Sequence, residues 1–188
     1  IGEAQDNWLK ARRAILRSPL DRIGYGGYLK LAIEWPGFVD EIQKIVGEFR
    51  QIHENMDGTG SYMAPFKVAI LNCWGKLRSW MCNQVHHSIW HREIYSYVGV
   101  IECLSGMPIE VEFIDFEQVR QGIDPDIRVI INAGDAYTSW SGAENWVDEK
   151  VVTNIRAFVD NGGGFIGVGE PSACQFQGRY FQLSDVLG

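Results

Sequence analysis

The sequence predicts an α/β protein in which a parallel sheet is flanked by helices, preceded by a mostly helical segment. In the second part of the chain, short apolar runs with β-branched residues alternate with stretches that carry one apolar stripe. Such alternation is typical of β-α-β units, whose strands are parallel. The first part carries helical patterns without such an alternation. A polar, flexible break, DGTGS at 57–61, separates the two parts, so we expect domains at 1–57 and 62–188.

The first part predicts two helices joined by a glycine-rich loop. Residues 8–17 are rich in helix formers and stop before Pro19, because the residue that precedes a proline is pushed out of helical geometry. A second helix is expected to start near Pro36, which suits the first turn of a helix. Its apolar residues recur at steps of four and three, at Phe38, Ile42, Ile45, Phe49, Ile52 and Met56.

The second part predicts four strands and two helices. We expect strands at 66–71, 109–114, 128–132 and 164–168, and helices at 90–104 and 146–159. In open parallel sheets, ligands bind outside the carboxyl ends of the strands. Here those ends lie at residues 72–76, 132–135 and 169–172.

Composition narrows the class of protein. The 188 residues carry a net charge of −7, which argues against an electrostatic role on nucleic acid. Cysteines at 73, 82, 103 and 174 form no C-x-x-C pair, so neither a zinc site nor a disulfide framework is indicated, and no metal is expected. Reduced thiols suit a cytoplasmic protein.

No apolar run approaches the eighteen residues of a membrane span, and no leader peptide is recognisable, so we expect no membrane partner. The chain opens on Ile1 and stops directly after an apolar stretch. We therefore expect it to be a fragment of a longer protein.

The segment DRIGYGGY at 21–28 is the first candidate site. Its three glycines let the backbone approach a ligand closely, and Arg22 offers a planar fork of donors suited to phosphate or carboxylate. Tyr25 and Tyr28 each add a hydroxyl and a flat face, as sugar sites commonly do. The alternative is a tight connection in which Arg22 pairs with Asp21 or another acid.

Two further motifs lie near the predicted last strand. Gly162, Gly164 and Gly167 spell G-x-G-x-x-G, but they close a helix and start a strand, the reverse of a dinucleotide site. GVGEP at 167–171 occupies the place where amidotransferase-like domains carry a nucleophilic cysteine on a sharp turn, and no cysteine or serine stands at its apex. Cys174 is either a displaced nucleophile or an inert thiol.

Two other clusters leave alternatives open. His86, His87 and His91 are closely spaced, and without a complete ligand set they are either structural or metal-binding. The segment NCWGKLRSW at 72–80 joins two cations to two tryptophans at a strand's carboxyl end, and is either a solvated basic loop or a binding loop.

Several blocks together resemble the β-galactoside phosphorylases typified by lacto-N-biose/galacto-N-biose phosphorylase. These blocks run in the same order over nearly the whole chain: DRIGYGGY at 21–28, LNCWGKLR at 71–78, VHH at 85–87, YSY at 95–97 and GGGFIGVGEP at 162–171. Proteins of that family are several times longer. They combine an N-terminal (β/α)8 barrel that carries the active site, a middle α/β domain and C-terminal β domains.

The resemblance implies a fold for each part. Residues 1–57 would be the last, helical part of a (β/α)8 barrel. Residues 62–188 would be a Rossmann-like, amidotransferase-like middle domain, similar to the trimerisation domain of some β-galactosidases. Phosphate is often held near the last two strands of such barrels, so the resemblance assigns substrate and phosphate binding to Arg22, Tyr25, Gly26 and Tyr28. The family's catalytic acid lies upstream, and no catalytic residue is expected in this chain.

The implied activity is that of a glycosyltransferase of carbohydrate metabolism. It would phosphorolyse a terminal β-galactoside reversibly to galactose 1-phosphate and a free sugar, with inorganic phosphate as co-substrate and no other cofactor. The alternative is a non-catalytic α/β module for subunit association or regulation. We expect a cytoplasmic homo-oligomer whose partners are a β-galactosyl disaccharide and phosphate, and whose isolated fragment is inactive.

Overall fold

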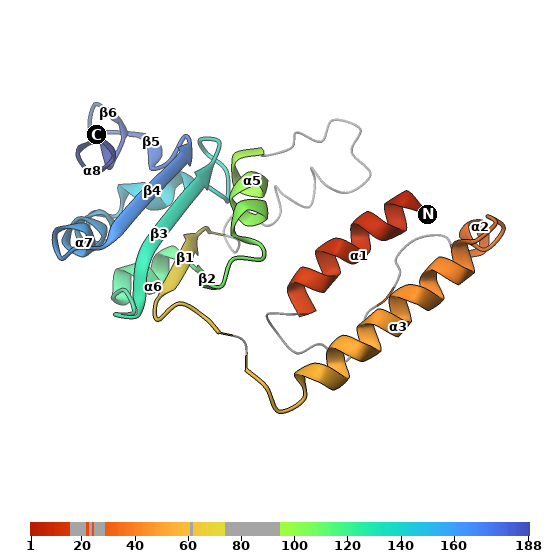
Figure 1. The fold of residues 1–188 in the computed structure, drawn as a ribbon. Helices are drawn as coiled ribbons and strands as arrows, with labels where there is room; N and C mark the ends of the chain where they lie inside the picture. The colour runs from red at the N-terminus through yellow and green to blue at the C-terminus, as the bar shows by residue number, and fades with distance from the viewer. Residues whose placement is uncertain (16–21, 23, 25–28, 61, 74–94) are drawn as a thin grey trace. The chain divides into compact units, whose positions relative to one another are not determined.

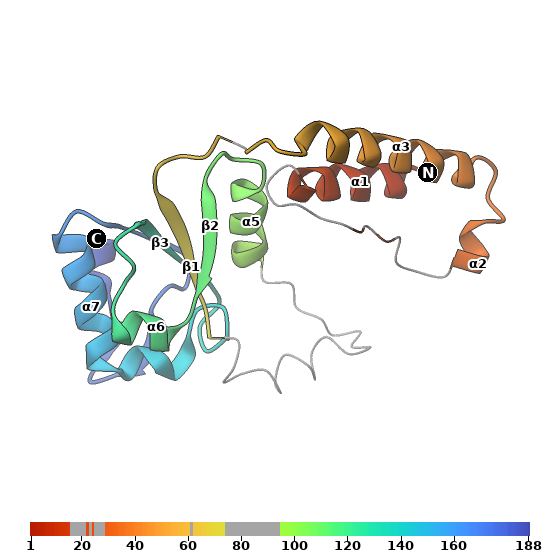
Figure 2. The same cartoon turned by 90° about the horizontal axis from the view of Figure 1, so that it is seen from below.

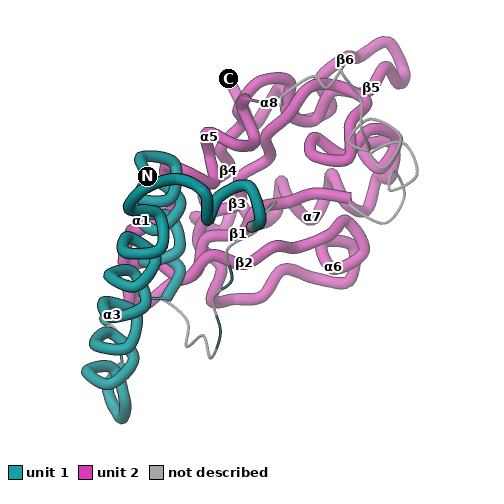
Figure 3. Tube along the Cα trace, turned by 90° about the vertical axis from the view of Figure 1, so that its right-hand side faces the viewer, with its two compact units in different colours: residues 1–62 teal, residues 63–188 magenta. Residues whose placement is uncertain are grey.

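A computed structural model describes residues 1–15, 22, 24, 29–60, 62–73 and 95–188. The chain divides into two compact units, residues 1–62 and 63–188, shown in different colours in Figure 3. Each unit is described by itself. No helix in the described ranges is both long and apolar enough to cross a membrane.

The first unit consists of helices in its described residues. They are α1 (Gly2–Ile15), α2 (Leu29–Ala32) and α3 (Phe38–Met56), and α1 lies beside α3 (Figures 1 and 2). Trp8 is buried on α1, and its Nε1 donates to Glu48 Oε2 of α3 at 2.7 Å. The predicted helices are confirmed. The first begins at Gly2, six residues before the predicted start. Sequence reasoning missed these opening turns because they are mostly polar and carry no apolar stripe.

The second unit is built on a four-stranded parallel sheet in the order β2-β1-β3-β4. A two-stranded antiparallel hairpin, β5-β6, follows it. The strands are β1 (Lys67–Leu71), β2 (Glu110–Ile114), β3 (Ile127–Gly134), β4 (Gly164–Gly169), β5 (Ala173–Phe176) and β6 (Arg179–Phe181). The helices are α5 (Tyr95–Leu104), α6 (Phe116–Gln121), the 3-10 helix η1 (Ala143–Val147), α7 (Glu149–Asp160) and α8 (Ser184–Leu187).

Helices cover both faces of this sheet. α5 lies on one face and α6 and α7 lie on the other (Figures 1 and 2). Successive residues of β1 alternate between the two cores: Ile70 packs with Tyr97 of α5, whereas Leu71 belongs to the core that includes Val119 of α6 and Ile155 of α7. Because both faces are buried around the central strand β1, that strand appears in the sequence as an almost continuous apolar run, whereas the edge strand β2 carries two glutamates. The predicted α/β class with a parallel sheet is confirmed.

The glycine motif at 162–167 ends a helix and starts a strand, as predicted. Gly162 has φ 92°, and Gly163 N donates to Phe158 O at 2.9 Å, while Gly162 N donates to Val159 O at 2.9 Å. These two bonds form a Schellman motif, which satisfies the last carbonyl groups of α7. β4 then begins at Gly164. No dinucleotide turn is present at these described residues.

Sequence reasoning missed α2 in the first unit and several short elements in the second. α6, the β5-β6 hairpin and α8 were not predicted, and the helix expected at 146–159 begins at Glu149, after η1. Asp148 sets this start because its side chain accepts a bond from Lys150 N at 2.9 Å. The missed elements have three to six residues, which is too short to show a helical or alternating pattern.

An ion pair joins α8 to α7. Arg156 Nε donates to Asp185 Oδ2 at 2.7 Å and Arg156 Nη2 donates to Oδ1 at 2.9 Å, a bidentate arrangement. Arg156 Nη2 also donates to Gln182 O at 3.1 Å. The bonds from Arg156 hold the pKa of Asp185 below its usual range, although partial burial opposes the shift.

This lowered pKa predicts a pH-dependent contribution to stability. The contribution is complete above the unfolded pKa of about 3.9 and is lost as the pH falls through the lower folded pKa. Because Asp185 is half exposed, we expect Asp185→Asn to cost about 0.5–1 kcal/mol at pH 7 and less at about pH 3, below the unfolded pKa. Urea unfolding at both pH values measures this difference. Arg156→Gln should cost a similar amount and the double variant little more, whereas additive losses would contradict the pairing.

Candidate functional site

The segment predicted to bind phosphate is described only in part. Arg22 and Gly24 are exposed, and a Cβ atom built on Gly24 would meet nothing within 4 Å. Tyr25, Gly26 and Tyr28 lie outside the described residues, as does Asp21. The assignment of these residues to phosphate or sugar therefore stays a prediction.

The carboxyl ends of β1, β3 and β4 meet at one edge of the sheet, as the predicted β-α-β pattern implies. Asn132, buried in β3, is the residue that joins them. Its Nδ2 lies 3.3 Å from Leu71 O and 3.0 Å from Ser141 O, and its Oδ1 accepts a bond from Ser172 N at 3.0 Å. Asn132 thus connects the end of β1, the loop after β3 and the turn after β4.

The loop after β3, residues 135–142, folds on itself. Thr138 Oγ1 donates to Asp135 O at 2.6 Å, and Gly142 N donates to Thr138 O at 2.9 Å. Cys73 N, just beyond β1, donates to Ser139 O at 2.8 Å. These bonds bury much of the loop and leave Tyr137 at its tip exposed.

The turn after β4 has a glycine at its apex. Gly169 has φ 82°, which a residue with a side chain rarely adopts. A Cβ atom there would lie 2.9 Å from Gly134 O and 3.1 Å from Ser96 Oγ. The apex of this turn therefore has no room for a nucleophilic side chain.

Cys174 does not replace that nucleophile. It lies buried in β5, and burial, together with the charge of Glu144, raises the pKa of its thiol. A raised pKa keeps the sulfur protonated, whereas a nucleophile needs the thiolate. The inert-thiol interpretation is therefore the better one. His86, His87 and His91, the candidate metal ligands, lie outside the described residues.

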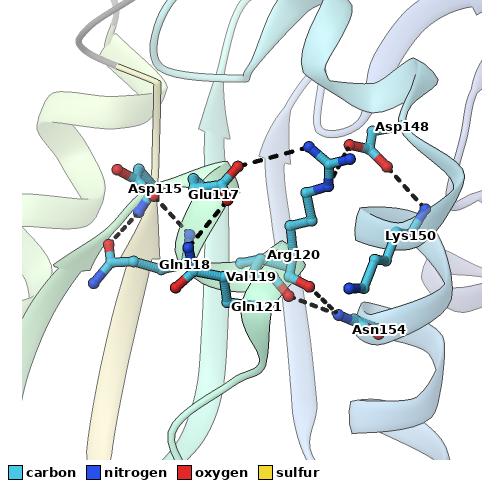
Figure 4. Close-up of polar contacts among 9 residues, drawn as sticks. All are labelled: Asp115, Glu117, Gln118, Val119, Arg120, Gln121, Asp148, Lys150 and Asn154. Atoms are coloured by element: carbon cyan, nitrogen blue, oxygen red, sulfur yellow. Dashed lines mark hydrogen bonds and ion pairs between the residues drawn. The ribbon is translucent and has the colours of Figure 1, made fainter.

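A groove of about 720 Å³ lies at the same edge of the sheet, between α6, η1 and α7. Figure 4 shows polar contacts of α6 and of the start of α7, among them those of Arg120, which lines the groove. Arg120 Nε lies 3.4 Å from Asp148 Oδ2, and Arg120 Nη1 lies 3.8 Å from Glu117 Oε2. With Asp115, Glu144 and Glu149 also lining it, the groove is acidic, and its arginine already faces two carboxylates. It is unsuited to phosphate.

The groove was missed by sequence reasoning although a local signal was present. Asp115 accepts a bond from Gln118 N at 2.8 Å, and Gln118 Oε1 accepts one from Asp115 N at 2.8 Å. This capping box fixes the start of α6. The pattern Asp-x-x-Gln directly after a predicted strand would have located the helix that forms one wall.

Over the ranges that the structure describes, no three histidine, cysteine, aspartate or glutamate side chains are grouped so that they could hold a metal ion. The polar groups at the sheet edge are instead joined to one another and to the backbone. These bonds hold the loop after β3 and the turn after β4 in place and leave side chains such as Tyr137 exposed.

Comparison with known proteins places both units in one family. A model of the lacto-N-biose phosphorylase central domain matches residues 67–188, and a model of the lacto-N-biose phosphorylase N-terminal TIM barrel domain matches residues 1–64. The chain belongs to the lacto-N-biose phosphorylase family. This finding confirms the resemblance carried by the sequence motifs.

Individual relatives align with 99–100% of this chain. It is 56% identical over 190 residues to a 1,3-β-galactosyl-N-acetylhexosamine phosphorylase of Lachnoclostridium phytofermentans, covering 100% of this chain and 26% of that protein. It is 52% identical to the phosphorylase of the same name from Bifidobacterium longum, over 99% of this chain and 25% of that protein. Identity to a D-galactosyl-β-1→4-L-rhamnose phosphorylase of L. phytofermentans is 40%, with the same coverage. The chain spans about a quarter of the length of these relatives.

Proposed function

We propose that the chain is part of an enzyme that reversibly phosphorolyses a terminal β-galactoside, a galactosyl-N-acetylhexosamine or a related disaccharide. The observation that carries this proposal is the 56% identity, over the whole chain, to a protein named for that activity. The lower identity of 40% to the D-galactosyl-β-1→4-L-rhamnose phosphorylase favours an N-acetylhexosamine as the released sugar.

In the proposed reaction an oxygen of inorganic phosphate attacks the anomeric carbon of the galactosyl group. The bond between that carbon and the bridging oxygen breaks, and a carboxylic acid gives its proton to the departing oxygen. Galactose 1-phosphate and the free sugar are the products. One carboxyl group suffices, because phosphate takes the place of the water that a base activates in an inverting hydrolase. We place that acid in the part of the barrel that precedes this chain.

Phosphate binding is the additional requirement of this reaction. We assign it to Arg22, with Tyr25, Gly26 and Tyr28 contacting phosphate or the galactosyl group. The exposed position of Arg22 supports this assignment, since a guanidinium group offers two parallel donors to phosphate oxygens. Phosphate is then a co-substrate, and no other cofactor is required.

We infer that the second unit is a Rossmann-like, amidotransferase-like scaffold that has no nucleophile. The parallel sheet, the sharp turn at Gly169 and the raised pKa of Cys174 support this inference. The alternative to a part in a phosphorylase is a non-catalytic α/β module for subunit association or regulation. We also propose that the enzyme is a cytoplasmic homo-oligomer that binds neither nucleic acid nor membranes.

We expect the complete enzyme, incubated with phosphate and a β1,3-linked galactosyl-N-acetylhexosamine, to release galactose 1-phosphate. The 188-residue chain alone should release none, because it lacks the acid. A coupled assay for galactose 1-phosphate measures both, with β1,4-galactosyl-rhamnose as the comparison substrate. Absence of product from the complete enzyme would contradict the function, and turnover by the pure chain would contradict the domain assignment.

A further inference from the structure

We propose that an exposed aromatic surface at the carboxyl ends of β3 and β4 binds a pyranose ring. We call it the tyrosine surface and define it as Tyr137, Tyr180 and Glu170. The ligand class rests on the proposed function, because a galactosyl disaccharide is the ligand that this enzyme would meet. The surface itself is defined by contacts within the second unit.

Hydrogen bonds hold the tyrosine surface together from three separate segments. Tyr180 OH, on β6, donates to Glu170 Oε1 at 2.9 Å, and Ala136 N, in the loop after β3, donates to Glu170 Oε2 at 2.9 Å. Gln175 N, on β5, donates to Tyr137 OH at 3.1 Å. Both rings are therefore fixed in place before a ligand arrives, which lowers the entropy that binding costs.

Both rings nevertheless remain accessible. Tyr137 is 48% exposed and Tyr180 is 36% exposed. Phe181 packs edge-on against Tyr180, with ring centroids 4.9 Å apart, and so supports that ring from one side. Large aromatic side chains with an apolar face and a polar tip are suited to ligands that are apolar on one side and polar on the other.

The backbone at Tyr137 is strained. Its φ is 58°, a left-handed conformation that is unusual for a bulky residue. Such a conformation costs of order 1–3 kcal/mol and persists only where the surrounding structure imposes it, most often at ligand sites. Here the internal hydrogen bonds of the loop hold this conformation, and the Tyr137 side chain remains half exposed.

Charge distinguishes a sugar from the other polar ligands of this enzyme. Glu170 carries a negative charge, so the surface repels phosphate and other anions. A neutral pyranose is not repelled and can place its C–H face on a tyrosine ring. Tyr137 OH, which accepts from Gln175 N, still has its own proton to donate.

The test is photolabelling of the complete enzyme without phosphate, using a β-galactoside that carries a diazirine group. Peptide mass spectrometry should find label on peptides that contain Tyr137 or Tyr180, and methyl β-galactoside should suppress it. N-acetylglucosamine as a second competitor distinguishes a site for the galactosyl ring from one for the released sugar. A diazirine without a sugar serves as the control for unspecific labelling.

Variants sharpen this experiment. Tyr137→Ala and Tyr180→Ala should each raise the competitor concentration that halves the labelling by roughly five- to tenfold, the loss of one ring contact. Tyr180→Phe should have a smaller effect because it keeps the ring. Phe113→Ala, which removes an exposed aromatic residue from the opposite edge strand β2, should leave labelling unchanged.

The inference is overturned if these peptides take no label, if free sugar does not compete, or if Phe113→Ala acts as strongly as Tyr180→Ala. A protein partner that covers the surface would give the first of these results. If the complete enzyme catalyses phosphorolysis but these peptides take no label, only the sugar contact at the tyrosine surface is contradicted. Labelling without phosphorolysis would count against the proposed reaction and leave the sugar contact standing.

Discussion

In the complete enzyme, Arg22→Ala is expected to weaken the apparent affinity for phosphate by roughly ten- to more than a hundredfold. The physical reason is the loss of a charge-assisted hydrogen bond, which contributes on the order of 1.5–3 kcal/mol. Arg22→Lys should recover only part of the loss, because an ammonium group cannot form the two parallel bonds of a guanidinium group. The measurement is phosphorolysis at varied phosphate concentration.

Tyr25→Phe is the matched comparison within the same segment. It removes one neutral hydrogen bond and keeps the aromatic ring, so its effect should be smaller than that of Arg22→Ala. Thermal unfolding of each variant separates loss of binding from loss of structure. If Arg22→Ala lowers the melting temperature markedly but leaves the phosphate kinetics unchanged, the alternative interpretation holds, in which Arg22 pairs with an acid such as Asp21.

Asn132→Asp is expected to destabilise the second unit by about 3–5 kcal/mol at pH 7. The new carboxyl group would have nearly the shape of the amide, but it would face the carbonyl oxygens of Leu71 and Ser141 as a buried, unpaired charge. The midpoint of thermal or urea unfolding measures the loss. Asn154→Asp is the control, because Asn154 also donates to two backbone carbonyls, at 2.8 and 3.1 Å, from a less buried position.

The pH dependence of this variant has a definite sign. Burial against carbonyl oxygens must raise the folded-state pKa of the new carboxyl group above its unfolded value of about 3.9. The difference from the native protein should therefore be largest at neutral pH and should shrink as the pH falls toward 4. A loss independent of pH would mean that the missing amide bonds, and not the buried charge, cause the destabilisation.

Elements with strong local patterns could be predicted from the sequence. The apolar stripe of α3 and the β-branched runs of β1 and β3 are sufficient because burial on one face of a helix, or on both faces of a strand, leaves a repeat in the chain. The Gly162 turn was also predicted from local chemistry. α6 was not predicted although its capping box is a local signal, and the β5-β6 hairpin was not predicted because its strands contain too few residues for a repeat.

The candidate site could likewise be predicted only in part from the sequence. The carboxyl ends of the strands were expected to meet, and the contacts of Asn132 with Leu71 and Ser172 confirm it. Nothing in the sequence distinguishes Asn132 from other asparagines as the residue that joins them. The phosphate assignment of Arg22, Tyr25, Gly26 and Tyr28 rests on the family resemblance and stays a prediction.

The sequence by itself determined the α/β class, the parallel sheet and the family, because these depend on local periodicity and on contiguous motifs. Only the tertiary structure decided the strand order, the closed apex at Gly169 and the meeting of Tyr137, Glu170 and Tyr180. Those features depend on contacts between segments ten to sixty residues apart, as the bonds of Asn132 and Glu170 show. Such contacts join residues of different strands and loops, and they leave no repeat in the chain from which they could be predicted.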